Sequence, residues 1–194
     1  MADDAWLVVG LGNPGPSYAM TRHNVGYLVC DVLAERLGSP WRAHKSGRAQ
    51  VVEGRLPPLP GPRVVLGRAR SYMNESGGPV AGLLAFYKVP PERLVVVHDE
   101  LDLPPGSLRV KFGGGDNGHN GLRSIRTSIA TGDYFRVRVG IGRPGGQESA
   151  SDHVLAPLGR AGVDALGRCA ERAADAVESL LRRGLEETQS AFNA

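Results

Sequence analysis

The stretch LVVVHDE, residues 94–100, begins with the clearest buried strand in the sequence, residues 94–98. Its four consecutive apolar residues, three of them β-branched, are typical of a strand that is covered on both faces of its sheet. The run ends in His98, Asp99 and Glu100, which predicts that polar side chains emerge where the strand reaches the rim of the sheet. A strand covered on both faces needs helices above and below it, so this stretch favours an α/β fold.

The segments on either side alternate between strand and helix patterns. We predict strands over 6–12, 49–55, 63–70, 106–112 and 134–141, and helices over 24–37, 76–88 and about 118–130. Strands 49–55 and 63–70 are joined by a proline-rich loop, which indicates an antiparallel pair. Apolar residues at helical spacing predict an amphipathic C-terminal helix at about 162–185. The prediction is a single domain, residues 1–194, with a mixed β-sheet sandwiched by α-helices.

Composition limits the compartment and the partners. The longest apolar runs are far shorter than the ~20 residues of a membrane helix, and the N-terminus lacks the basic start of a signal peptide. We therefore expect a cytoplasmic protein without a membrane partner. Cys30 and Cys169 lie in apolar helical patterns and show no metal-ligand spacing, so we expect both to be buried structural thiols.

The formal net charge of +3 is mild, but the basic residues are unevenly distributed. Between residues 109 and 143 there are seven arginines and lysines against two acids. In strand 134–141, Arg136 and Arg138 alternate with apolar residues and are expected to share the face opposite them. The excess charge indicates either a phosphate-facing surface or a solvated strand face, and charge alone does not decide between them.

Residues 10–15, Gly-Leu-Gly-Asn-Pro-Gly, have the spacing of a dinucleotide-binding loop in part. Pro14 removes a backbone donor, however, and no helix begins at once, which argues against nucleotide binding. Asn13 instead presents a side-chain amide that can both donate and accept hydrogen bonds.

His23 stands immediately before a predicted helix rather than within its apolar stripe. It could be a general base, or His23 or Asn24 could simply cap the helix. Asp99 is the best-placed partner, because a carboxylate that accepts from one imidazole nitrogen leaves the other free to take a proton from water. We interpret the two further acids, Glu100 and Asp102, as parts of a solvated turn.

Asparagines occupy junctions between predicted elements at positions 13, 74 and 120, the last within the glycine-rich loop of residues 113–121. Such a loop before a helix is suited to binding phosphate or ribose oxygens. The sequence shows no Gly-x-Ser-x-Gly elbow, catalytic-cysteine signature or metal-binding cluster. Direct attack by water is the mechanism that the remaining residues can support, and we expect no cofactor and no metal.

Five segments together closely resemble the bacterial peptidyl-tRNA hydrolases. They are GLGNPGPSYAMTRHNVG (10–26), SYMNESG (71–77), HDELDLPPG (98–106), GGGDNGHNGLRSI (113–125) and RVRVGIGRP (136–144). The resemblance implies a monomer with a twisted mixed sheet surrounded by helices. It also implies hydrolysis of the ester between a peptide and the terminal ribose of tRNA, so peptidyl-tRNA and tRNA are the expected partners.

The resemblance assigns residues by position. The expected catalytic residues are His23 as general base, Asp99 as its support, Asn120 as a group that positions water or the ester, and Asn13. The expected substrate-binding residues are Asn13, Tyr18, Tyr72, Met73, Asn74, His119 and Asn120. Lys111 and Arg138 fall on positions that contact tRNA phosphates.

Three residues depart from the family's usual pattern: Asp116 and Asn117 in the glycine-rich loop, and Tyr72 where phenylalanine is common. The loop residues and Tyr72 could each tune affinity without changing the reaction. Two other functions stay open at this point. A non-catalytic RNA-binding relative would keep the scaffold and the basic surface, and a nucleotide-dependent oxidoreductase would bind a cofactor at residues 10–15.

Overall fold

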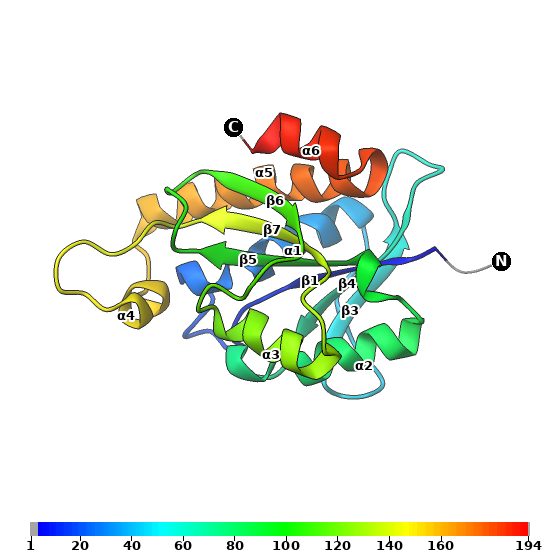
Figure 1. The fold of residues 1–194 in the computed structure, drawn as a ribbon, viewed down its shortest axis with the longest axis horizontal. Coiled ribbons are helices and arrows are strands. Elements are labelled where there is room, and N and C mark those ends of the chain that lie inside the picture. Colours follow the sequence, from blue (N-terminus) through cyan, green and yellow to red (C-terminus); the bar gives the residue numbers. More distant parts are fainter. Residues whose placement is uncertain (1–3, 194) are drawn as a thin grey trace.

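Strand β5 (Leu94–Glu100) lies inside a seven-stranded sheet, between β1 and β7, and every one of its residues is buried. This is seen in a computed structural model, which describes residues 4–193 (Figure 1). The strand order is β2-β3-β4-β1-β5-β7-β6. β1 pairs in parallel with β4 and β5, and β5 with β7, whereas β2–β3, β3–β4 and β6–β7 are antiparallel. The predicted mixed α/β sheet is therefore confirmed.

The remaining strands are β1 (Trp6–Gly10), β2 (Arg42–Ala43), β3 (Ala49–Arg55), β4 (Arg63–Ala69), β6 (Leu108–Phe112) and β7 (Phe135–Gly140). The α-helices are α1 (Val25–Leu37), α2 (Gly77–Tyr87), α3 (Asn120–Ile129), α4 (Ala150–Leu155), α5 (Arg160–Arg183) and α6 (Leu185–Phe192). Short 3₁₀ helices occupy η1 (Arg22–Asn24), η2 (Met73–Glu75) and η3 (Pro91–Arg93).

Helices cover both faces of the sheet, with α1 and α5 on one face and α2 and α3 on the other (Figure 1). Along β1, Val8 packs with α1 and α5, whereas Leu7 and Val9 pack with α2 and α3. This alternation follows from the two-residue period of a strand. Because both faces are apolar, the strand has no polar side chain until it reaches the rim.

Two glycines let α1 lie against the sheet. A side chain at Gly10 of β1 would collide with the backbone of Gly26 in α1, and one at Gly26 would collide with the carbonyl of Val97 in β5. In the 10–15 stretch, Gly10 thus serves a close contact between helix and strand. This contact fixes η1, and with it His23, at the carboxyl ends of β1 and β5.

The C-terminal helix differs from its prediction. The helix expected over 162–185 is α5, which begins at Arg160 and ends at Arg183 because Gly184 (φ 86°) breaks it. A further helix, α6, then runs along the edge strand β6. The side chains of Gln189 and Asn193 bond both backbone groups of Val110 there, with distances of 2.7 Å to its N–H and 3.0 Å to its carbonyl. Amide side chains thereby replace the missing neighbouring strand.

Arg136 and Arg138 lie two positions apart on β7 and therefore on one face of the strand, as predicted, but that face is neither solvated nor open to a phosphate at Arg136. The structure buries Arg136, which is 1% exposed, because its guanidinium donates to the carbonyls of Gly114 (2.8 Å), Gly132 (3.1 Å) and Gly115. Arg136 therefore holds the glycine-rich loop instead of facing a ligand.

The thiols differ from each other. Cys30 is fully buried, as predicted, and its burial raises the pKa of the thiol to about 12, whereas Cys169 is only partly buried. Among residues 4–193, the structure contains no helix long and apolar enough to cross a membrane.

Candidate active site

A cavity of about 330 Å³ opens at the carboxyl ends of β1 and β5, where the strand order changes direction. Seven of the predicted site residues line it: Asn13, His23, Met73, Asn74, Asp99, His119 and Asn120. They come from the loop after β1, from η1, η2 and β5, and from the start of α3. The fold thus brings together side chains separated by more than 100 residues in the sequence, at the edge where β5 was predicted to present polar groups.

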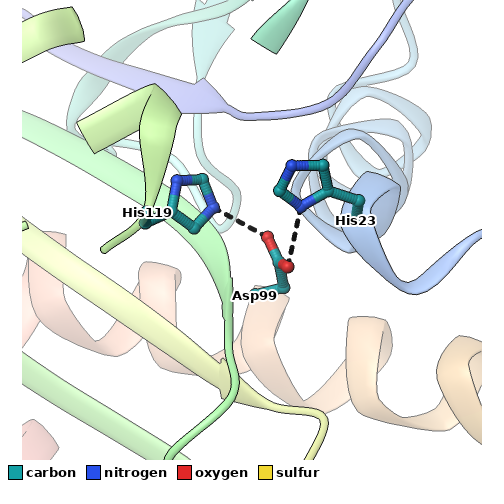
Figure 2. Close-up of side chains that lie close together, drawn as sticks. All are labelled: His23, Asp99 and His119. Carbon is teal, nitrogen blue, oxygen red and sulfur yellow. Dashed lines mark hydrogen bonds and ion pairs between the residues drawn. The ribbon is translucent and has the colours of Figure 1, made fainter. Parts of the chain in front are cut away.

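His23 lies at the centre of this group. Its Nδ1 is 2.8 Å from Oδ2 of Asp99, and its second ring nitrogen points away from the carboxylate (Figure 2). The His23 side chain is 14% exposed, whereas that of Asp99 is 2% exposed. Asn24 occupies the N-cap position of α1 but makes no side-chain cap hydrogen bond there, and the His23 side chain is directed to Asp99 instead.

Asp99 also binds a second imidazole. Nε2 of His119 is 2.8 Å from Oδ1 of Asp99, on the other side of the same carboxylate (Figure 2). Nδ1 of His119 accepts from the backbone N–H groups of Gly121 and Leu122, at 3.1 and 3.4 Å, and so caps α3. Both ring nitrogens of His119 are therefore occupied by the protein itself.

The electrostatics of Asp99 favour its ionised form. Burial alone would raise the pKa of Asp99, but the charges and hydrogen bonds of His119 and His23 act in the opposite direction and hold that pKa well below its usual range. An ionised carboxylate only accepts hydrogen bonds, so the two facing nitrogens carry the protons. In its neutral form His23 then has its lone pair on Nε2, the tautomer that a general base needs.

His98 adds a neutral group behind the site. Burial, reinforced by His119, lowers the pKa of His98 to about 3. Its Nδ1 lies 2.8 Å from the backbone carbonyl of Asp99 and donates to it. His98 therefore holds the backbone that carries the carboxylate without adding a charge.

The same three side chains have the composition of a metal site, since one ligand atom from each of His23, Asp99 and His119 lies within 4.8 Å of the others. A metal ion needs the lone pair of a neutral imidazole. The nitrogens that face Asp99 carry protons, and reversing the tautomer of His119 would remove the cap of α3. The hydrogen bonding therefore favours a proton-handling group over a metal centre.

Asn13 is held by Asn24, a residue predicted from the sequence only as a possible helix cap. The side chain of Asn24 bonds both the N–H and the carbonyl of Asn13, each at 2.9 Å. Oδ1 of Asn13 accepts from the backbone N–H of Met73 at 2.6 Å. Because the oxygen is used in this way, Asn13 has only its NH₂ group to offer to a ligand in the cavity.

The two predicted tyrosines lie outside the residues that line the cavity. Tyr72 directly precedes Met73, is 55% exposed, and packs edge to face with Tyr18 at 6.2 Å between ring centroids. Asn74 and Asn120 are exposed side chains within the lining. The cavity therefore combines a partly buried histidine, paired with a buried aspartate, with solvent-exposed amides.

The predicted phosphate contacts, Lys111 and Arg138, also lie outside the cavity lining, on β6 and β7. Burial, with the neighbouring charges of Arg138 and Arg136, lowers the pKa of Lys111. Arg138 is bound to Glu100, with distances of 2.6 and 3.1 Å to Oε1. Glu100 is 5% exposed, so the prediction that it belongs to a solvated turn is wrong, because its carboxylate neutralises an arginine inside the sheet.

Sequence reasoning missed the roles of Asn24, Glu100 and the doubly bonded His119. Their contacts join positions 11 to 38 residues apart. No local pattern reports such pairings, although the position of Glu100 at the end of a buried strand was a signal that it could be enclosed.

Comparison with known proteins gives one consistent result. A family model described as peptidyl-tRNA hydrolase matches residues 7–194. The chain is 55% identical over 192 residues to a peptidyl-tRNA hydrolase of Frankia alni, covering 99% of this chain and 95% of the relative. It is 56% identical to that of Streptomyces coelicolor, covering 97% and 95%. The crystal structure of peptidyl-tRNA hydrolase from Acinetobacter baumannii superposes with a TM-score of 0.85 at 37% identity, covering 100% and 95%.

Proposed function

The chain belongs to the peptidyl-tRNA hydrolase family and hydrolyses peptidyl-tRNA, and we propose that His23 is the general base of this reaction. The observation that carries the proposal is the 2.8 Å contact between Nδ1 of His23 and Asp99, with the other ring nitrogen directed away from the carboxylate. This geometry supplies an oriented imidazole beside a cavity that can hold water and an ester.

The proposed reaction has two proton transfers. Nε2 of His23 takes a proton from water while the water oxygen attacks the ester carbonyl, and Asp99 stabilises the imidazolium that forms. The oxyanion of the tetrahedral intermediate accepts hydrogen bonds from an amide, for which Asn120 is placed in the cavity. When the carbon–oxygen bond to the ribose breaks, His23 returns its proton to the ribose oxygen. The products are free tRNA and a peptide carboxylic acid, which loses its remaining proton to water and becomes a carboxylate.

Asn13 supports a preference for substrates with a blocked amino group. Its oxygen is occupied by Met73, so it presents N–H donors, which bind carbonyl oxygens. A free α-ammonium group would meet donors instead of acceptors and would lose its hydration without compensation. Asn74 and the Tyr18–Tyr72 pair are proposed to contact the terminal nucleotide of the tRNA, and Lys111 and Arg138 its phosphates.

We propose that the enzyme acts as a monomer, as the sequence resemblance to the family implies. The substrate is a product of translation, so we place the enzyme in the cytoplasm, as the sequence analysis expected.

The test is hydrolysis of a purified N-blocked aminoacyl-tRNA. His23→Ala is expected to lower kcat by about 10³-fold or more, because the base is lost while the cavity stays intact. His44→Asn is the matched control, since His44 is a buried histidine packed on Phe86, at 4.5 Å between rings, outside the cavity lining. Full turnover by the His23 variant would exclude the general-base role.

A further inference from the structure

The loop that leads into α3 has little stiffness of its own. Gly113, Gly114 and Gly118 adopt positive φ values of 73°, 110° and 77°, and Asn117 is in the left-handed region at 48°. Glycine-rich backbone has many accessible conformations, so contacts with the rest of the protein decide where the loop lies. These contacts matter because the loop ends at His119 and Asn120 in the active site.

The two halves of the loop are held by different residues. Arg136 binds the carbonyls of the first half, at Gly114 and Gly115. In the second half, the Nδ2 atom of Asn117 lies 2.6 Å from Oδ2 of Asp102 and 3.1 Å from each carboxylate oxygen of Glu100. Asn117 thereby fastens the loop to the end of β5 and the residues directly after it, one position beyond Asp99.

The chemistry of this contact is matched on both sides. The NH₂ group of Asn117 has two hydrogens, one for each carboxylate. Glu100 is also bound by Arg138 and Asp102 by Arg143, at 2.6 Å in both cases. Donors and acceptors thus alternate along Arg138, Glu100, Asn117, Asp102 and Arg143, so each negative charge has a partner.

Asparagine suits the position in its backbone as well. It tolerates a positive φ better than most residues, and its amide is the donor that two carboxylates require. Asn117 also lines the cavity, two positions before His119. We propose that Asn117 is a positioning residue for the hydrolysis: it ties the loop of residues 113–119 to Glu100 and Asp102 and so holds His119 against Asp99 and Asn120 in the cavity.

The expected loss of kcat rests on the proposed function, whereas the expected loss of order in the loop does not. Asn117 is solvent-exposed while Glu100 is buried, so the contact contributes order more than stability. A loop released at Asn117 leaves Asn120 displaced from the ester for part of the time. The expected loss therefore falls on kcat, whereas substrate affinity, which Lys111 and other distant groups support, changes little.

The decisive variant is Asn117→Asp, which keeps the shape and the tolerance for positive φ but places a third carboxylate between Glu100 and Asp102. It is expected to lower kcat on N-blocked aminoacyl-tRNA about tenfold with KM changed less than about threefold. Combining Asn117→Asp with Asp102→Asn restores a donor–acceptor pair with the original net charge and is expected to recover kcat to within about threefold. Asn117→Gly, which keeps the backbone and removes the amide, is expected to lie between them.

Hydrogen exchange of residues 113–121 gives a readout that does not depend on turnover. Exchange should be faster in Asn117→Asp and return toward the native rate in the double variant. Native kcat and native exchange in Asn117→Asp would overturn the proposal, as would a double variant no better than the single one. Absence of turnover in the native protein would instead defeat the proposed function, and the exchange measurements would still decide the role of Asn117.

Discussion

The carboxylate of Asp99 binds two imidazoles, those of His23 and His119. A substitution of Asp99 therefore disturbs both rings. Asp99→Asn offers one oxygen and one NH₂ group, so it can accept from only one of the two rings and donates to the other. One imidazole must then reverse its tautomer, which costs either the base at His23 or the cap of α3.

We therefore expect Asp99→Asn to lower kcat by about 10³–10⁴-fold, comparable to the loss of the orienting aspartate in a catalytic triad. Single-turnover hydrolysis of N-blocked aminoacyl-tRNA measures it. Asp133→Asn, an exposed carboxylate outside the cavity lining, is the control. Activity of the Asp99 variant within about tenfold of native would show that Asp99 does not set the tautomers.

His98 provides a pH prediction with a defined sign. Its pKa is about 3 in the folded protein and about 6.5, the ordinary value for histidine, in the unfolded chain, so between these values the unfolded chain binds a proton that the folded chain does not. The free energy of unfolding therefore falls as pH decreases from 6.5 toward 3, by up to about 1.4 kcal/mol per pH unit from this group. His98→Asn keeps a donor for the carbonyl of Asp99 but cannot titrate.

The check is denaturant unfolding between pH 6.5 and 4.5, a window above the range in which Asp99 loses its own contribution. The variant is expected to show a shallower decline with falling pH, even where its stability at neutral pH is lower because the ring has been removed. Parallel curves for the two proteins would contradict a neutral, buried His98.

At the residue scale, the sequence predicted the His23–Asp99 pair because both follow recognisable local patterns, a helix start and the end of a buried strand. It did not predict that His119 binds Asp99 or that Asn24 holds Asn13. These contacts depend on the packing of three separate loops, and each residue alone is compatible with a turn or a cap.

Among the elements, helix α1 depends on two glycines for its approach to the sheet. A side chain at Gly26 would lie 2.6 Å from the carbonyl oxygen of Leu11 and collide with that of Val97, both of which are backbone atoms that cannot rotate away. Helix α1 must move outward to admit any larger residue, and η1 moves with it.

Gly26→Ala is accordingly expected to destabilise the fold by about 3 kcal/mol and to lower activity through displacement of His23. Gly82→Ala in α2 is the matched control, since a side chain there meets no atom within 4 Å, and it should be neutral or slightly stabilising. Thermal unfolding and turnover of both variants decide the point. Similar effects of the two substitutions would show that helix propensity matters and contact does not.

The elements were largely predictable where they are long and periodic. β3 occupies the residues predicted for it, and α1 and α2 differ by one residue at their ends. The short α4 and the two-residue β2 were missed, because six or fewer residues do not establish a period. Tertiary contacts, such as the pairing of β2 with β3, determine elements of that length.

For the whole molecule, the positions of the charges say more about attraction for RNA than the net charge of +3 does. Lys111 keeps a cationic group on the edge strand, while Arg138 is already engaged by Glu100. Long-range attraction for RNA is expected to be concentrated on this side of the sheet and to weaken with salt.

Lys111→Ala is expected to raise KM for tRNA substrates, to reduce the salt dependence of log(kcat/KM) by about one in slope, and to leave a small N-blocked amino acid ester unaffected. Arg138→Ala should raise KM similarly and also lower kcat, because Glu100 then loses a partner. Arg183→Ala, at the C-terminal end of α5, controls for net charge. Equal losses on tRNA and on the small ester would contradict a role in phosphate binding.

The cover that α6 gives to β6 has a consequence for biosynthesis. The ribosome makes β6 about eighty residues before Asn193, so the strand that carries Lys111 emerges into the cell with its outer hydrogen-bonding groups unmatched. Only when the last helix has been translated can Gln189 and Asn193 close that edge. A nascent chain stalled before this point would expose an open strand to its neighbours. The stalled chain would then itself be a peptide still attached to tRNA, which is the substrate that the finished enzyme hydrolyses.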